Sequence, residues 1–156
     1  YRDLNRDDSR LPAMLDEISA LVAWGKDAHA RSNYAECAPF NAVVTRQFFK
    51  DALGDPNHAF LVVKSGAAIR GLLIGHCALY PFSHARFATD VLFVADAGGD
   101  LLLDAFIAWA QRKRVAVIES APSQSDRFDA LARLFESRGF MRCGGTFRKI
   151  LCEVKP

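Results

Sequence analysis

The sequence predicts an α/β (α+β) fold in which a mixed, partly parallel central sheet is flanked by helices. Apolar strand patterns separated by tight turns predict antiparallel hairpins, and a strand–helix–strand succession in the middle predicts a right-handed crossover with parallel pairing. The chain has 156 residues, 51% apolar and 24% charged. That size and composition favour a single domain over residues 1–156, with a loose segment at 1–10.

Two helices are expected in the first third of the chain. Apolar residues recur at three- and four-residue steps over 11–24, which predicts an amphipathic helix that Gly25 ends. The polar stretch 26–40 predicts a long connection, of a length at which loops are often functional. A second helix is expected over 41–53, capped by Asn41.

Three strands and a helix are expected next. The apolar runs 60–64 and 69–80, joined by a Ser-Gly turn, predict a hairpin. Residues 87–94 predict a third strand, in which Thr89 and Asp90 are the only polar residues. A glycine pair then opens a helix with an apolar stripe, which runs to about Lys113.

Strands and helices continue to alternate in the last third of the chain. The β-branched run 115–118 predicts a strand that ends at Glu119. A helix is expected over 127–138, with a glycine just past its end. The segments 140–143 and 146–152 flank a Gly-Gly turn and predict a final hairpin.

Composition disfavours several classes of function. The net charge is +2 and the 20 basic residues are spread along the chain, without the basic stripe of a nucleic-acid-binding protein. The four cysteines show no Cys-x-x-Cys spacing and the four histidines no paired spacing, so we expect no bound metal. The longest apolar run, 71–82, is too short to span a membrane, and the polar start shows no signal pattern. A cytoplasmic protein is expected.

Two segments resemble motifs of the GNAT superfamily, the acetyl-coenzyme-A-dependent N-acyltransferases. Segment 90–94 (DVLFV) with 98–110 (GGDLLLDAFIAWA) is similar to the cofactor-binding strand, phosphate loop and helix of that family. Segment 131–140 (LARLFESRGF) is similar to its fourth helix and the following Gly-Phe exit. The resemblance covers roughly residues 10–152. It implies a GNAT-like fold, acetyl-CoA as co-substrate, an amine acceptor as partner, and it is compatible with a homodimer.

The resemblance also implies where coenzyme A would bind. The implied positions are Phe93, Val94, Gly98, Gly99, Asp100, Leu101, Phe128 and Phe135. The first two would offer backbone groups to the pantetheine arm where their strand parts from the next one. The next four would offer N–H groups at a helix start, which suit a pyrophosphate. The two phenylalanines would pack beside the cofactor.

Three departures from the family pattern bear on this implied site. The loop 95–100 is shorter than usual, lacks the usual Arg, and carries Asp96 and Asp100, whose charges disfavour a phosphate. Asp100 has an alternative role as a simple helix cap. Phe128 and Phe135 stand where the family often has Asn and a Tyr that protonates the leaving thiolate.

Three residues are candidates for the general base that amide formation requires: Asp90, Glu119 and His84. Asp90 precedes Val94 by four residues, so strand alternation predicts that both point to one face. Its alternative role is a polar residue bonded to a neighbouring loop. Glu119 ends a strand, where parallel-sheet sites gather, and is otherwise solvated or paired. His84 lies in a loop, where a lone His is usually solvated.

The function that follows is transfer of an acetyl group from acetyl-CoA to an amine of a small molecule or a protein. The acceptor would be selected by the regions 26–40 and 80–86. The acidic, shortened loop and the two phenylalanines favour an alternative, a catalytically degenerate GNAT-like module for binding or assembly. A partner-binding α/β domain is the third hypothesis.

Overall fold

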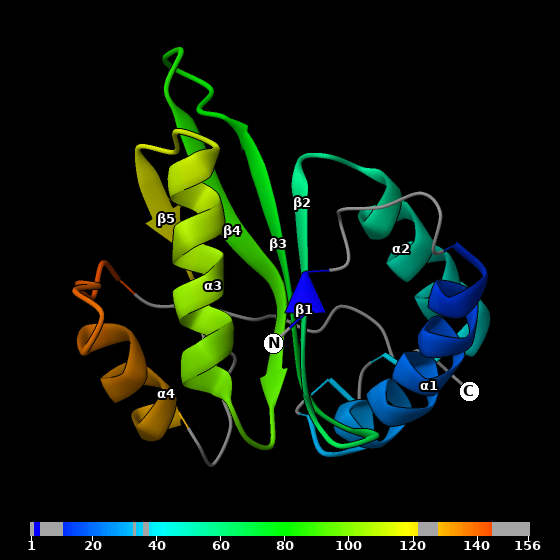
Figure 1. The fold of residues 1–156 in the computed structure, drawn as a ribbon. Helices are drawn as coiled ribbons and strands as arrows, with labels where there is room; N and C mark the ends of the chain where they lie inside the picture. Colours follow the sequence, from blue (N-terminus) through cyan, green and yellow to red (C-terminus); the bar gives the residue numbers. More distant parts are fainter. Residues whose placement is uncertain (1, 4–10, 33, 36–37, 122–127, 145–156) are drawn as a thin grey trace.

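The computed structural model describes residues 2–3, 11–32, 34–35, 38–121 and 128–144, with side chains except at 2–3, 11–16 and 128. Its helices are α1 (Leu11–Ala30), α2 (Ala42–Gly54), α3 (Gly99–Arg112) and α4 (Phe128–Glu136). Its strands are β1 (Arg2–Asp3), β2 (His58–Ser65), β3 (Ala68–Leu79), β4 (Arg86–Ala95) and β5 (Val117–Glu119). Figure 1 shows α1 and α2 on one face of the sheet and α3 and α4 on the other.

The described strands form one mixed sheet in the order β1-β2-β3-β4-β5. The pairs β1–β2, β2–β3 and β3–β4 are antiparallel, and β4–β5 is parallel. The parallel pair is the one that α3 connects, as the right-handed crossover requires. The predicted mixed, partly parallel sheet flanked by helices is therefore confirmed.

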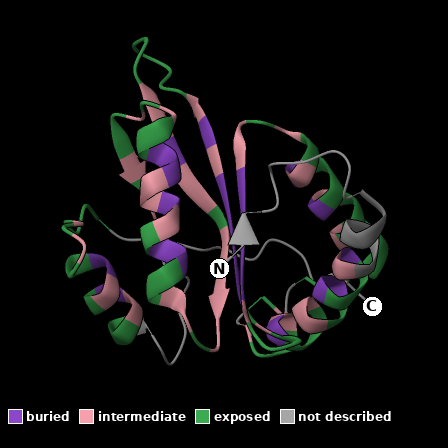
Figure 2. Cartoon of the chain, viewed as in Figure 1, coloured by how far each residue is buried: buried purple, intermediate pink, exposed green. Residues whose placement is uncertain are grey.

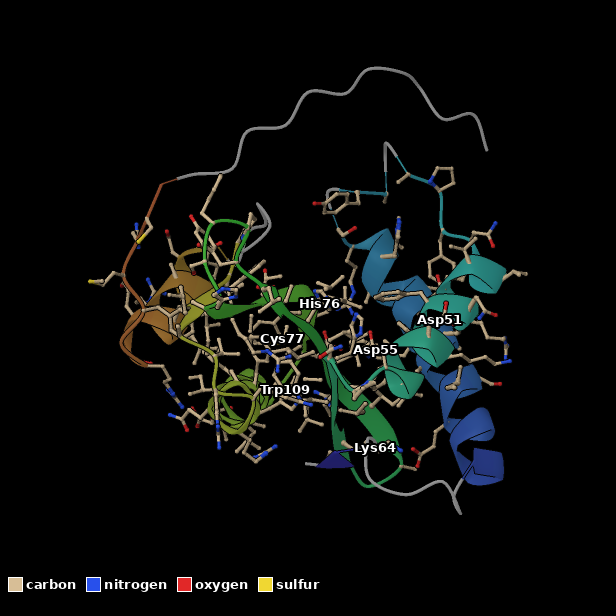
Figure 3. All side chains as sticks on the ribbon, turned by 90° about the horizontal axis from the view of Figure 1, so that it is seen from above. Asp51, Asp55, Lys64, His76, Cys77 and Trp109 are labelled. Carbon is tan, nitrogen blue, oxygen red and sulfur yellow. The ribbon has the colours of Figure 1, made fainter. Side chains whose placement is uncertain are left out.

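Each face of the sheet carries its own apolar core. The core on the α1 and α2 face includes Phe49 and Phe60, whose rings meet edge to face at 5.6 Å. The core on the α3 face includes Phe106, stacked on Trp109 at 5.7 Å. Figure 2 shows the buried residues on the central strands and on the helix sides that face them. In Figure 3, seen from above, Trp109 lies on the α3 side and Asp55 on the α2 side.

Helix α1 runs to Ala30, so the expectation that Gly25 ends it was wrong, and 26–30 are helical rather than part of a loop. Lys26, Ala28 and Ala30 are good helix formers, and Ala28 is buried. A glycine inside a helix costs only about 1 kcal/mol relative to Ala, which packing of the helix against the sheet offsets.

Replacing Gly25 by Ala is expected to raise the free energy of unfolding by about 0.5–1 kcal/mol. The reason is that a Cβ there meets nothing within 4 Å while it restricts the unfolded chain. The control is Gly98→Ala, where φ is +72° and the new Cβ would lie 2.8 Å from Val63. It should lose about 1–3 kcal/mol. Urea denaturation measures both, and a clear loss of stability in Gly25→Ala would contradict a continuous α1.

Two predicted strands, 115–118 and 140–143, do not begin where expected. In each case the backbone N–H of the first residue donates to the end of the preceding helix instead. Val115 N–H donates to Ala110 O (3.0 Å) at the end of α3, so β5 begins only at Val117. Phe140 N–H donates to Phe135 O (3.2 Å), which closes α4 beyond Gly139 at φ +83°. This is the Schellman pattern of a helix end. Residues 140–144 therefore form no strand, and the segment 146–152 of the predicted hairpin lies outside the described residues.

At the other end of the chain, Arg2 and Asp3 pair with Val62 and Leu61 of β2. The expectation that the first ten residues are loose is thus wrong for these two. Residues 1 and 4–10 lie outside the described part of the chain.

Candidate active site

Strands β4 and β5 pair over three residues, and β5 then ends at Glu119 while β4 runs on; we call this point the parting of the strands. The parallel register joins Phe87, Ala88 and Thr89 to Val117, Ile118 and Glu119, respectively. Beyond Thr89, β4 continues through Ala95, and there the described strands pair with it only on the β3 side. Figure 1 shows β5 ending beside the upper half of β4 while β4 runs on to the start of α3. A length of main chain is thus left on the side where the pantetheine arm was expected.

A bulge at Val91 reverses the expected orientation of Asp90. Gly75 pairs with Asp90 and Ile74 pairs with Leu92, so Val91 is the extra residue. Asp90 shares the α3 face with Gly75, above which the Phe106 ring lies. Val94 pairs with Leu72, which belongs to the core on the α1 and α2 face. The prediction that Asp90 and Val94 point to one face was therefore wrong, because an extra residue shifts the alternation by one.

Asp90 and Ser120 meet where the two strands part. Each follows directly on a residue of the last β4–β5 pair, Thr89 with Glu119. Asp90 Oδ1 and Ser120 Oγ are both buried and have no hydrogen-bond partner among the described residues. Buried polar atoms without a partner are uncommon in proteins and call for an explanation. Ser120 was missed in the sequence, where its position after the strand that ends at Glu119 was the one available signal.

Burial raises the pKa of the Asp90 carboxyl above its usual range. The Ser120 side chain and the backbone at Asp90 and Ala121 act in the opposite direction with smaller effect. Ser120 is near enough to favour the carboxylate in part, although its Oγ is not in hydrogen-bonding geometry. A carboxylate with a raised pKa is a stronger base, which suits proton abstraction from an amine.

The other two candidate bases, Glu119 and His84, do not share the face on which Asp90 lies or the place where it stands. Glu119 is exposed and projects from the face opposite Asp90, because it pairs with Thr89. His84 is exposed in the connection between β3 and β4. β4 begins at Arg86, four residues and about 13 Å of strand from Asp90. The structure therefore brings Glu119 to the parting of the strands and leaves His84 away from it.

The start of α3 offers backbone donors beside this parting. Gly98 is the N-cap residue, at φ +72° and against Val63, so this position requires a glycine. The N–H groups of residues 99–101 have no acceptor within the helix, since the first bond is Leu102 N–H to Gly98 O (3.1 Å). The N-cap residue is Gly98, and Asp100 lies in the first turn of α3, where an acidic side chain favours the helix dipole. These features fit an anion at the expected position.

The charge of Asp96 in the loop before α3 is compensated. Arg31 Nη1 donates to Asp96 Oδ1 at 2.9 Å, and this guanidinium holds the pKa of Asp96 below its usual range. Arg70 contributes in the same direction with a smaller effect. The N–H groups of Asp96 and Ala97 both donate to Arg70 O, at 2.7 and 3.2 Å. The repulsion expected from Asp96 is thus offset, but its own N–H group is already used.

Helix α4 is fastened to the start of α3. Arg138 Nε and Nη2 donate to the two carboxylate oxygens of Asp104 at 2.9 and 3.1 Å. The hydrogen bond to Asp104 raises the pKa of Arg138, and the charge of Asp100 adds a smaller effect in the same direction. A cation therefore stands beside the acidic first turn of α3 and reduces its negative charge.

Phe135, placed beside the cofactor by the resemblance, packs against Phe93 of β4. Their rings meet edge to face at 6.1 Å, and Phe135 is buried. Phe93 belongs to the core on the α3 face, so the two rings pack over that face of β4 rather than in the plane of the sheet between the strands. Leu101 is half exposed. The Phe128 side chain lies outside the described residues.

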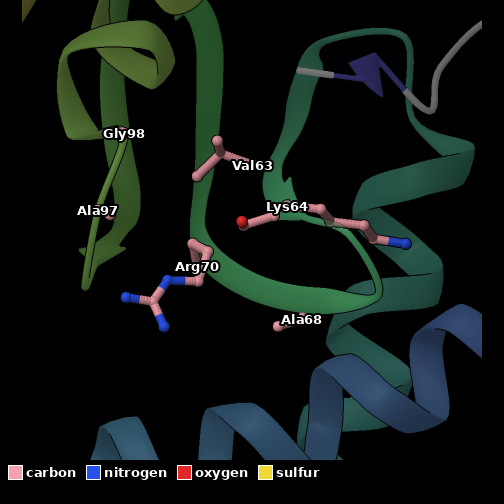
Figure 4. A pocket seen from close by; sticks show the side chains of 7 residues that line it. Val63, Lys64, Ala68, Arg70, Ala97 and Gly98 are labelled. Carbon is pink, nitrogen blue, oxygen red and sulfur yellow. The ribbon is translucent and has the colours of Figure 1, made fainter.

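A pocket of about 330 Å³ lies on the β3 side of the loop before α3 and not at the parting. Figure 4 shows Lys64 and Arg70 at this pocket, with their side chains pointing in different directions. Its lining residues are Val63, Lys64, Ser65, Ala68, Arg70, Ala97 and Gly98. Lys64 Nζ is bound to Glu17 at 3.1 Å. The lining of this pocket contains no carboxylate or imidazole that could act as a general base for acyl transfer.

The described part of the chain shows neither a cluster of metal ligands nor a helix that could cross a membrane. His, Cys, Asp and Glu side chains there form no group of three that could hold a metal ion. Among the helices described, none combines the length and the apolar composition that crossing a bilayer demands.

The fold is that of the acetyltransferases, as comparison with solved structures shows. A predicted acetyltransferase from Clostridium acetobutylicum, solved with acetyl-CoA, is 12% identical, with a TM-score of 0.66 over 86% of this chain and 90% of that chain. A GNAT family acetyltransferase from Staphylococcus aureus is 14% identical, with a TM-score of 0.59 over 93% and 94%. A transcriptional regulator from Bacillus halodurans is 16% identical, with a TM-score of 0.66 over 95% and 96%.

The particular fold is therefore the GNAT fold, as the two sequence motifs led us to expect. No protein-family model matches the chain, and no curated protein does so. The likeness lies in the backbone architecture at 12–16% identity, so it establishes the fold and leaves the activity to be argued from the site.

Proposed function

We propose that this protein transfers an acetyl group from acetyl-CoA to an amine. The observation that carries the proposal is the parting of β4 and β5, with Asp90 at its start, whose Oδ1 is buried and has no hydrogen-bond partner among the described residues. The first turn of α3, whose N–H groups have no acceptor within the helix, stands at the far end of the same strand. An extended thioester cofactor needs these features in this order: a carboxylate near the acyl group, main chain along the arm and donors at the phosphates.

In this proposal the chain supplies three functions. The main chain of β4 from Asp90 to Ala95 holds the arm as an added strand would, and Phe93 and Val94 lie within that length. The N–H groups of residues 99–101 hold the pyrophosphate. Asp90 accepts the proton that the attacking amine loses, and its raised pKa suits that step.

Acetyl-CoA would supply the activated acetyl group as a thioester. The nitrogen–carbon bond forms, the carbon–sulfur bond breaks, and the amine proton passes to Asp90. Phe135 stands where a tyrosine acid would be and cannot donate a proton, so the leaving thiolate takes its proton from solvent. A thiol with a pKa of about 8.5 leaves tolerably well without an acid.

Two observations favour the alternative, a GNAT-like binding module without turnover. Arg70 O occupies the N–H groups of Asp96 and Ala97, which leaves fewer donors for a phosphate. The Phe135 ring packs edge to face with Phe93 and with Phe140 and offers no acid. The two functions differ in turnover and not in the fold.

Thermal unfolding with acetyl-CoA tests the proposal. A ligand present at 100 times its Kd and bound only by the folded state raises the free energy of unfolding by about 2.7 kcal/mol. We expect a concentration-dependent rise in Tm with acetyl-CoA and none with NAD⁺, which has a pyrophosphate but no pantetheine arm. The absence of binding at millimolar acetyl-CoA would remove the proposal. Binding without thiol release across a panel of amines would favour the binding module.

A further inference from the structure

Four polar residues form one row across neighbouring strands of the sheet. His58 of β2 pairs with His76 of β3, His76 pairs with Thr89 of β4, and Thr89 pairs with Glu119 of β5. The row lies outside both register shifts, since these occur at Val63/Lys64 and at Ile74/Gly75. Directly paired residues project to the same side of a sheet, so the four side chains stand next to one another.

The row projects from the face that α1 and α2 cover. The residues beside it in the chain belong to the opposite core, under α3: Ala59, Cys77, Ala88 and Ile118. Two positions further along the strands, on the same face as the row, lie Phe60, Ile74 and Leu92, which pack in the core under α1 and α2. The polar row is therefore the first row at which the two helices no longer bury that face completely.

Carboxylates stand at both ends of the row. His58 Nδ1 lies 2.9 Å from Asp55 Oδ2, and the rings of His58 and His76 are in contact at 4.7 Å. The backbone N–H of Asn57 holds the pKa of Asp55 below its usual range, with His58 and His76 acting in the same direction. Glu119 is exposed at the other end, three strand spacings or about 14 Å away. Arg86, three residues before Thr89 on β4, donates from Nη2 to Asn57 Oδ1 at 3.0 Å.

The next row outward is apolar and open. It consists of Ala78, Phe87 and Val117, again paired in register. Val117 is 53% exposed, and the Phe87 ring meets Tyr80 edge to face at 6.4 Å. Tyr80 in turn meets Phe82, whose side chain is 88% exposed. An open apolar row thus lies directly beside a row with carboxylates at its ends.

We propose that these two rows, which we call the open face, bind the acceptor, and that it is a protonated primary amine on an aromatic or aliphatic skeleton. The inference rests on the proposed transfer reaction and names its substrate class. The ammonium lies at Glu119, in the last pair before the strands part, on the face opposite the Asp90 side chain. The skeleton lies over Phe87 and Val117.

Charge and polarity decide between acceptor classes. Glu119 attracts a cation and repels an anionic amine such as an acidic peptide terminus. A polyhydroxylated sugar amine would leave its hydroxyl groups without partners over Ala78, Phe87 and Val117, which is unfavourable.

The test is direct binding to the protein without coenzyme A, so that it does not depend on turnover. The probe is 2-phenylethylamine, titrated by NMR at pH 7.5. The control ligands are 2-phenylethanol, which has the same skeleton without the charge, and glucosamine, which has the charge on a polar skeleton. We expect the amine to bind about fivefold more tightly than either, and equal binding of all three would overturn the inference.

Variants locate the binding. Glu119→Gln should weaken 2-phenylethylamine about two- to fivefold without changing 2-phenylethanol, since it removes charge alone. Val117→Ser should weaken both by about threefold. The control Glu136→Gln removes a carboxylate of α4 that pairs with Arg142, and it should change the binding of neither ligand. If Glu119→Gln left the affinity for 2-phenylethylamine unchanged, the amine would bind at another place and the inference would be overturned.

The outcomes also separate this inference from the proposed function. If 2-phenylethylamine binds at the open face and acetyl-CoA does not bind, the transferase proposal fails while the amine site stands. If acetyl-CoA is turned over only with sugar amines, the transferase stands and the open face is wrong as the acceptor site.

Discussion

Replacing Asp90 by Asn is expected to lower the turnover number of amine acetylation by about 10²- to 10⁴-fold, the usual contribution of a general base. The side chain keeps its size but can no longer accept the amine proton. Thiol release under saturating acetyl-CoA measures the effect. Binding of acetyl-CoA should change little, because the proposed contacts to the arm come from the backbone of β4.

The same substitution should leave the stability at pH 7 equal to or higher than that of the wild type. Burial raises the pKa of Asp90 in the folded state, so the stability linked to this group is present below its unfolded pKa and is lost as the pH rises through the folded one. Asn carries no charge and avoids that loss. The turnover of the wild type should rise with pH through the same raised pKa.

The control for Asp90→Asn is Asp51→Asn, an exposed α2 carboxylate that accepts a hydrogen bond from Gln47. It should retain wild-type turnover. If Asp90→Asn also retained turnover, Asp90 would be a structural residue and the proposed base would have to be abandoned. Higher stability with lost turnover is the combination that a purely structural carboxyl would not produce.

Replacing Gly75 by Ala is expected to lower the free energy of unfolding by about 1–3 kcal/mol or more, the cost of overpacking a core. An added Cβ would lie 2.1 Å from Phe106 Cε2, a separation that real structures do not tolerate. Phe106 is 1% exposed and stacked on Trp109, so its ring has little room to move. Urea denaturation measures the loss.

A double variant tests the cause. Phe106→Leu removes part of the ring that meets the new Cβ, so Gly75→Ala/Phe106→Leu should lose about 1 kcal/mol less than the sum of the two single variants. Additive losses would mean that Gly75 matters for another reason. The matched control is Gly54→Ala at the end of α2, where a Cβ meets nothing within 4 Å.

Gly75 links the core to the candidate site. It pairs with Asp90 and lies beside the bulge at Val91. Phe106 fills the space that a side chain at position 75 would occupy. β3 therefore presents no side chain next to Asp90, its partner on β4. The space next to Asp90 is thus shaped by a glycine that the sequence motifs did not single out.

Periodicity and turn residues determined most of the elements. The strand over 87–94, the helix opened by the glycine pair and the helix that Gly139 closes all lie where they were predicted. These elements depend on local chemistry: alternating burial, positive φ and helix-end hydrogen bonding. Asp90 was identified because a lone carboxylate in an apolar strand is conspicuous.

Only the tertiary structure decided which side chains meet. A single extra residue at Val91 turned Asp90 to the α3 face, and no sequence pattern marks a bulge of this kind. Strand pairing between residues far apart in the chain brought Ser120 next to Asp90. It also brought His58 into one row with Glu119. Burial then raised the pKa of Asp90. Local preferences act over a few residues, whereas register, burial and charge compensation depend on how distant segments pack.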